Sequence, residues 1–131
     1  MQKIINTTSG DIRLRSSAAT VIFYKSEFGK DFFSDAIATA KMFESLSFKE
    51  GEEPDFSELS MEEIERIDLS LIYQMLWCFA RGADKNIEPL ADWLDNYDDL
   101  PLEEVTPAIS ELMEATFKTT KKSKLKTNQK N

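Results

Sequence analysis

One apolar stretch constrains the fold more than any other feature of this 131-residue chain. Residues 69–80 read LSLIYQMLWCFA, and apolar positions recur at spacings of three and four both within this run and before it. A helix with this pattern is apolar on most sides, which is typical of a helix buried by its neighbours. The run is also too short to cross a bilayer. It therefore predicts a central buried helix and argues against a membrane protein.

Local signals define both ends of this helix. Ser60-Met61-Glu62-Glu63 matches the capping box, in which Ser60 and Glu63 each accept a hydrogen bond from the other's backbone N–H group. Gly82 is a suitable residue for the end of the helix. We therefore predict one continuous helix over residues 60–81. Cys78 lies on its apolar stripe, so we interpret it as a small core side chain rather than a reactive thiol.

Four more helices are expected, over residues 18–28, 30–46, 88–96 and 102–118. Gly29 ends the first of them, and Pro89 suits the first turn of the third. Pro107 lies inside the last helix, where it either follows a new N-cap at Thr106 or kinks the helix. Residues 47–59 contain Gly51, Pro54 and five acidic residues, and they read as a linker loop.

The chain before the first helix is polar and short. Residues 1–10 read as a flexible arm, and residues 11–15, DIRLR, alternate polar and apolar positions. This alternation fits a short strand or an extended segment lying on a helix, and no second run follows that could pair with a strand. The predicted fold is mainly α: a single domain over residues 11–118, built as a compact bundle of about five helices with a possible short N-terminal strand.

Charge is distributed unevenly along the sequence. The chain has a net charge of −8, but residues 1–117 carry 24 acidic and 10 basic groups, a net of −14, and residues 118–131 carry six lysines and no acid. The acidic body disfavours nucleic-acid binding. The lysine-rich end has one leucine and no aromatic residue, so residues 119–131 are predicted to be a disordered tail. A phosphate-contacting arm is the alternative interpretation.

The composition excludes several classes of protein. The chain has no histidine and one cysteine, which rules out an intrachain disulfide, a Cys/His zinc site and a histidine-activated nucleophile. No glycine-rich phosphate loop occurs, and the acidic residues from Asp92 onward lack the glycine that a calcium loop needs, because Tyr97 occupies that position. The N-terminus also lacks the apolar core of a signal peptide, so we predict a cytosolic protein. Because the motifs of catalytic and metal-binding sites are missing, we predict that it is not an enzyme and holds no cofactor or metal.

Aromatic residues are concentrated in one part of the chain. Six of the fourteen fall within 21 residues, from Phe23 to Phe43. Two short helices cannot easily bury so many large rings, so part of this stretch is a candidate surface for an apolar partner helix. The alternative is that all of them belong to the core. The candidate partner-binding residues are Tyr24, Phe28, Phe32 and Phe33.

Four short motifs follow one another along the chain: Ile12-Arg13-Leu14-Arg15, Tyr24-Lys25-Ser26-Glu27-Phe28-Gly29, Phe79-Ala80-Arg81-Gly82-Ala83-Asp84 and Asp92-Trp93-Leu94-Asp95. This series resembles a known family, the tail assembly chaperones of long-tailed phages and prophages of Firmicutes. The resemblance covers residues 11–126, and its persuasive feature is the order and spacing of weak motifs. The family often has a proline and more basic residues in the tyrosine-containing helix, where this chain has Thr20-Val21-Ile22-Phe23.

This resemblance implies a non-enzymatic role in tail morphogenesis. Such chaperones bind the long, apolar tape-measure protein, keep it soluble and help recruit tail-tube protein. They act in the cytoplasm of the bacterial host and are absent from the mature virion. A ribosomal frameshift commonly produces a longer form, and Lys121-Lys122 is compatible with an A-rich slippery site. A gene without a slippery heptamer near these codons would refute that hypothesis.

Two other interpretations remain open from the sequence. The chain fits an acidic protein-binding module, and it fits a DNA mimic that blocks a nucleic-acid-binding protein. A mimic needs regularly spaced exposed carboxylates and binds in a strongly salt-dependent way. Here the acidic residues gather in the linker and at helix starts, which favours a role in solubility. Self-association is a further open alternative.

Overall fold

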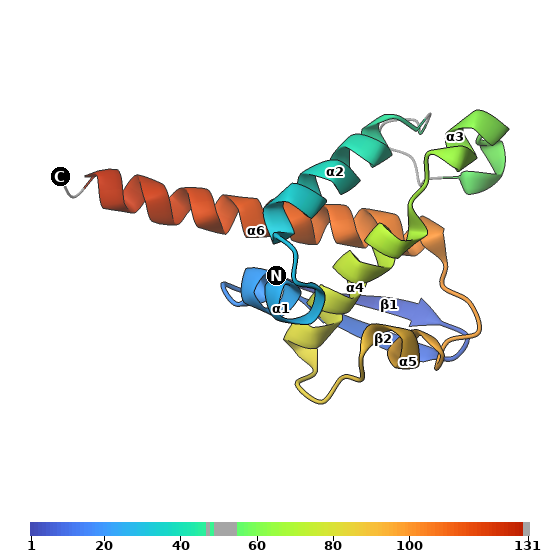
Figure 1. The fold of residues 1–131 in the computed structure, drawn as a ribbon, viewed down its shortest axis with the longest axis horizontal. Coiled ribbons are helices and arrows are strands. Elements are labelled where there is room, and N and C mark those ends of the chain that lie inside the picture. Colours follow the sequence, from blue (N-terminus) through green and yellow to red (C-terminus); the bar gives the residue numbers. More distant parts are fainter. Residues whose placement is uncertain (47, 49–54, 130–131) are drawn as a thin grey trace.

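The computed structural model describes the backbone of residues 1–46, 48 and 55–129, with side chains described as far as residue 118. The described residues are mostly helical and carry a two-stranded antiparallel sheet at the N-terminus (Figure 1). The strands are β1 (Gln2–Thr7) and β2 (Gly10–Arg15), and a short 3-10 turn, η1, covers Phe56–Glu58. The helices are α1 (Thr20–Phe28), α2 (Phe32–Glu44), α3 (Met61–Glu65), α4 (Leu69–Ala83), α5 (Leu90–Leu94) and α6 (Leu102–Gln129).

The N-terminal segment is a β-hairpin, so the prediction of a flexible arm over residues 1–10 is wrong. β1 pairs with β2 in the register Ile5↔Ile12, and the two-residue turn is closed by Gly10 at a φ of 126°. Ile5, Ile12 and Leu14 are buried on the inner face. The partner of DIRLR precedes it rather than follows it. Adjacent Ile4 and Ile5 obscure the alternation of β1, because only Ile5 is buried.

Helix α4 is the central buried element, as its apolar run predicts. Seven of its fifteen residues are buried, in a nearly continuous run from Ile72 to Ala80. It contacts β2, α1, α2, α5 and α6. In Figure 1, α2 and α3 lie toward one end of the molecule, and the hairpin and α5 lie toward the other. α4 joins these two ends.

Gly82 lies inside α4 and does not end it, which differs from the prediction. A Cβ atom at Gly82 would overlap the carbonyl oxygen of Arg15 in β2. The glycine therefore serves a close approach between helix and strand backbones. The helix ends instead at Ala83, and the backbone of the next residue, Asp84, is extended.

The predicted continuous helix over residues 60–81 is divided in two. The capping box is present: Ser60 Oγ accepts from the Glu63 N–H at 3.1 Å, and Glu63 Oε1 accepts from the Ser60 N–H at 3.3 Å. The first helix, α3, nevertheless ends at Glu65. Asp68 then caps a new helix, since its side chain accepts from the Leu71 N–H at 3.1 Å.

Helix α6 is continuous through Pro107 and extends to Gln129, beyond the predicted end at Lys118. Its buried side chains include Val105, Ile109, Leu112 and Met113. The helical backbone continues into the segment predicted to be a disordered tail over residues 119–131. Two features favour this extension: the lysines are good helix formers, and no glycine or proline interrupts the segment.

Candidate protein-interaction surface

The four aromatic residues predicted to bind a partner do come together, but mainly inside the core. Tyr24 and Phe32 are fully buried, with 0% and 1% of their surfaces exposed, so the prediction that they form a surface is wrong. Their rings lie 5.7 Å apart in an edge-on arrangement, and Phe32 also packs edge-on against Phe79. The alternative interpretation, that these rings belong to the core, is therefore correct for Tyr24 and Phe32.

The other two candidates are partly buried against neighbouring rings. Phe28 packs edge-on against Trp77 of α4, with ring centroids 5.5 Å apart. Phe33 stacks on Phe117 of α6 at 5.3 Å. Both rings are partly buried and pack against the core cluster, so they join α1 and α2 to the rest of the fold. Both rings are therefore only partly accessible to a partner.

A buried polar network holds the Tyr24 hydroxyl. This hydroxyl donates to Asp35 Oδ2 at 2.5 Å and lies 3.1 Å from Gln74 Oε1, while Lys30 Nζ lies 3.1 Å from the same carboxylate oxygen of Asp35. Burial, followed by the hydrogen bond to Asp35, raises the pKa of Tyr24 far above its ordinary value. Tyr24 is thus a neutral structural link between α1, α2 and α4.

Cys78 is a buried thiol, as its place on the apolar stripe predicts. Its S–H group donates to the Thr20 carbonyl, with 3.1 Å between sulfur and oxygen, and the residue has no exposed surface. Burial raises the pKa of the thiol to about 12. A thiol in this setting is a poor nucleophile, because the thiolate is the reactive form.

Exposed apolar side chains gather instead where α3 meets α4. Met61, Ile64 and Leu69 expose 74%, 45% and 42% of their surfaces, and we call these three residues the α3–α4 shoulder. Ile64 belongs to the apolar stripe that the sequence assigns to the central helix. Because the helix breaks after Glu65, this first part of the stripe turns away from the core.

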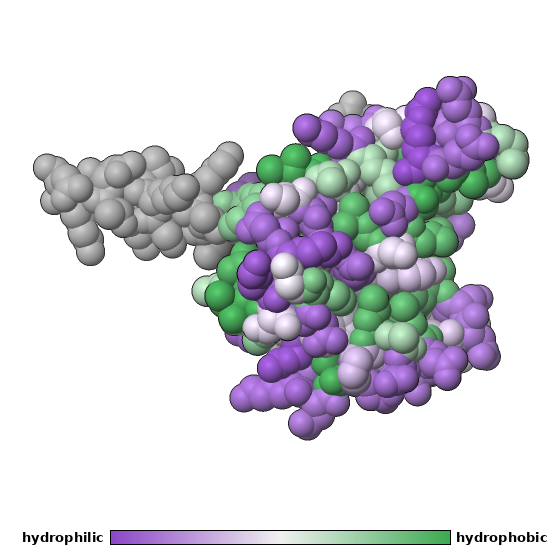
Figure 2. Space-filling model, in the orientation of Figure 1, coloured by the Kyte–Doolittle hydropathy of each residue, from purple (hydrophilic) through white to green (hydrophobic). Residues whose placement is uncertain are grey.

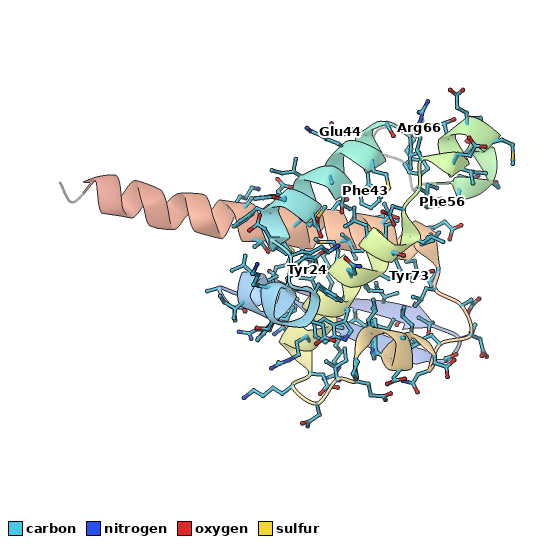
Figure 3. The ribbon with its side chains drawn as sticks, in the orientation of Figure 1. Tyr24, Phe43, Glu44, Phe56, Arg66 and Tyr73 are labelled. Carbon is cyan, nitrogen blue, oxygen red and sulfur yellow. The ribbon has the colours of Figure 1, made fainter. Side chains whose placement is uncertain are left out.

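Contacts with α2 hold the shoulder in place. Arg66 Nη1 donates to the Ser45 carbonyl at 3.0 Å, and Met42 Sδ accepts from the Asp68 N–H at 3.1 Å. Figure 3 shows Arg66, Phe43 of α2 and Phe56 of η1 in the region between α2 and α3. These contacts therefore stabilise the break between α3 and α4.

Acidic groups surround the shoulder. Glu58, Glu62 and Glu65 are exposed in η1 and α3, and among the described residues only Glu62 has a nearby cation, Arg66, at 3.7 Å. Figure 2 shows hydrophilic and hydrophobic residues side by side over this end of the molecule. The shoulder thus combines exposed apolar side chains with an anionic rim, an arrangement suited to an amphipathic segment that carries basic residues.

Sequence reasoning missed the shoulder because it read the stripe as one helix. The signal for the break was Asp68, a good N-cap residue directly before the densest apolar run. Within the described part of the chain, no group of three or more Cys, Asp or Glu side chains is placed to hold a metal ion. Over the same residues, no helix combines the length and apolar character needed to cross a membrane.

Comparison with protein-family models, with curated proteins and with solved structures finds no match for this chain.

Proposed function

We propose that this protein is a non-enzymatic binding module whose α3–α4 shoulder holds an amphipathic helical segment of a partner protein. The observation that carries the proposal is the exposure of Met61, Ile64 and Leu69 within an acidic rim. Scattered exposed apolar residues are normal on protein surfaces, but a group supported by contacts with a second helix is suited to receive a partner.

The resemblance in the order of the sequence motifs suggests which partner this is. We propose that the protein acts as a phage tail assembly chaperone that binds the tape-measure protein, keeps it soluble and helps recruit tail-tube subunits. It would act in the cytoplasm of the bacterial host and leave before the virion matures. The net charge of −8 supports this role, because a strongly charged module keeps a complex with an apolar partner in solution.

Co-expression with the tape-measure protein encoded nearby tests the proposed function. We expect the soluble fraction of the tape-measure protein to rise with the wild-type chain and to fall back with Met61→Ser combined with Ile64→Ser. Both side chains are exposed, so this variant is expected to remain folded, as circular dichroism would check.

Ile22→Ser is the matched control, because Ile22 is 61% exposed on α1, away from the shoulder. It should keep the full solubilising effect. Equal loss with the control and the shoulder variant would exclude the shoulder as the binding surface. No gain in tape-measure solubility with the wild-type chain would refute the chaperone role itself.

A further inference from the structure

A basic groove lies at the hairpin end of the molecule, away from the shoulder. It has a volume of about 920 Å³ and runs between the hairpin and the end of α4. Of the described residues that line it, four are cationic and none is acidic. The groove is therefore locally positive in a chain whose net charge is −8. The lining consists of Gln2, Lys3, Ile4, Arg13, Leu14, Arg15, Gly82, Ala83 and Lys85.

Three of the four cations have no ion-pair partner among the residues that the structure describes. Lys3 pairs with Glu111 of α6, whereas Arg13, Arg15 and Lys85 make no ion pair within the part of the chain that the structure describes. Lys85 follows the C-terminal end of α4, where a cation complements the helix dipole. Arg13 and Arg15 lie on the opposite wall, in β2, where they do not complement a helix dipole.

The spacing of the two arginines indicates the shape of a ligand. Arg13 and Arg15 are two residues apart on β2 and share its exposed face, so their Cα atoms lie about 7 Å apart. Acidic residues two positions apart on an extended peptide have the same spacing, and each guanidinium can bind a carboxylate with two hydrogen bonds. Ile4, which pairs with Arg13 across the hairpin and is 59% exposed, offers an apolar contact beside them.

We propose that this groove binds an extended acidic peptide segment of a partner protein, with alternate carboxylates on Arg13 and Arg15. A single-stranded nucleic acid would also supply regularly spaced anions, but two observations disfavour it. Within the described part of the chain, the groove lining contains no aromatic side chain on which a base could stack. The acidic groups over the rest of the body repel a polyanion longer than the groove.

The acidic residues nearest to the groove limit its positive region on one side. A smaller hollow of about 340 Å³ shares Arg13 with the groove and is lined also by Asp11 and Asp84. The site is independent of the proposed chaperone surface, since α4 separates the two by about 20 Å along its axis. A Met61→Ser and Ile64→Ser variant is therefore expected to bind an acidic peptide as the wild type does.

Fluorescence anisotropy with a fluorescein-labelled peptide that alternates glutamate and threonine tests the site. We expect saturable binding to the wild-type chain at low ionic strength. Arg13→Ala with Arg15→Ala should weaken binding roughly tenfold or more, because each change removes a charge-assisted pair. Lys41→Ala with Lys118→Ala, which removes two exposed lysines elsewhere, is the control for net charge and should change binding less than about twofold.

Two further probes distinguish the proposed ligand from other anions. A peptide of the same composition with its glutamates in one block should bind more weakly, and a single-stranded oligothymidylate of matched charge should bind more weakly still. Equal binding of the two peptides, tighter binding of the oligonucleotide or no binding of either peptide would overturn the proposal. If the arginine variant does not fold, Lys85→Glu on the other wall must weaken binding, and unchanged binding would refute the site.

Discussion

Gly82 is the residue at which α4 and β2 touch backbone to backbone. A side chain there would overlap the carbonyl oxygen of Arg15. Neither the backbone of α4 nor that of the paired strand β2 can easily shift to relieve the overlap. We expect Gly82→Ala to lower the free energy of unfolding by roughly 1–3 kcal/mol, as overpacking does. Urea unfolding measures this loss. Ser70→Ala, exposed on the same helix, is the control and should change stability by less than about 0.5 kcal/mol.

The Cys78 thiol should make stability depend on alkaline pH. Its pKa is about 12 in the folded chain against an ordinary value of 9.0, so the unfolded chain loses the thiol proton first. The stabilisation is complete below pH 9 and is lost as pH rises toward 12, at no more than about 1.4 kcal/mol per pH unit.

Urea unfolding of the wild type and of Cys78→Ala between pH 8 and 10 isolates this effect, with the pH range chosen around the ordinary thiol pKa. The substitution lowers stability at every pH, so the slope and not the absolute value is compared. The wild type should lose stability more steeply above pH 9 than the variant. Parallel slopes would mean that the thiol ionises as readily in the folded chain as in the unfolded one.

At the scale of elements, the break between α3 and α4 depends on Asp68. We expect Asp68→Ala to lower the free energy of unfolding by about 1 kcal/mol, because the Leu71 N–H loses its acceptor. Chemical denaturation measures the change. Asp92→Ala, on the exposed side of α5, is the control because no capping bond depends on its side chain within the described residues. A variant as stable as the wild type would show that the contacts of Arg66 and Met42 alone maintain the break.

The helical elements could be predicted where one sequence signal outweighed the others. The apolar run before Gly82 implied burial of α4 because few positions on that helix could face water. The break at Asp68 could not be predicted from periodicity, since Ile64, Ile67 and Leu71 continue one stripe whether or not the helix is continuous. Contacts of residues 66 and 68 with the end of α2, distant in sequence, support the break.

The candidate site was only partly predictable for a related reason. The sequence indicated that Tyr24, Phe28, Phe32 and Phe33 belong together, and the structure brings them together. Whether such a cluster faces water depends on what covers it, and here the cover comes from α4 and α6, some 40 to 90 positions later in the chain. The composition of residues 23–43 alone therefore does not reveal whether α4 and α6 cover the cluster.

At the scale of the whole molecule, uneven charge should make stability depend on salt. The chain carries eight more acidic than basic groups, and added salt screens their mutual repulsion. We expect the free energy of unfolding to rise by on the order of 1 kcal/mol between low and moderate sodium chloride. Glu62→Gln with Glu65→Gln, both exposed on α3, should reduce this rise. A loss of stability with salt in the wild type would show that attractive ion pairs outweigh the repulsion.

The N-terminal hairpin has a consequence for folding during synthesis. β1 and β2 are translated before α4, yet their inner face, Ile5, Ile12 and Leu14, is buried by packing that includes α4. An isolated two-stranded hairpin is at best marginally stable in water. Since α4 ends at Ala83, the ribosome must add nearly seventy residues after Arg15. At bacterial elongation rates this takes roughly 3–14 seconds, during which the hairpin lacks the helix that covers its inner face.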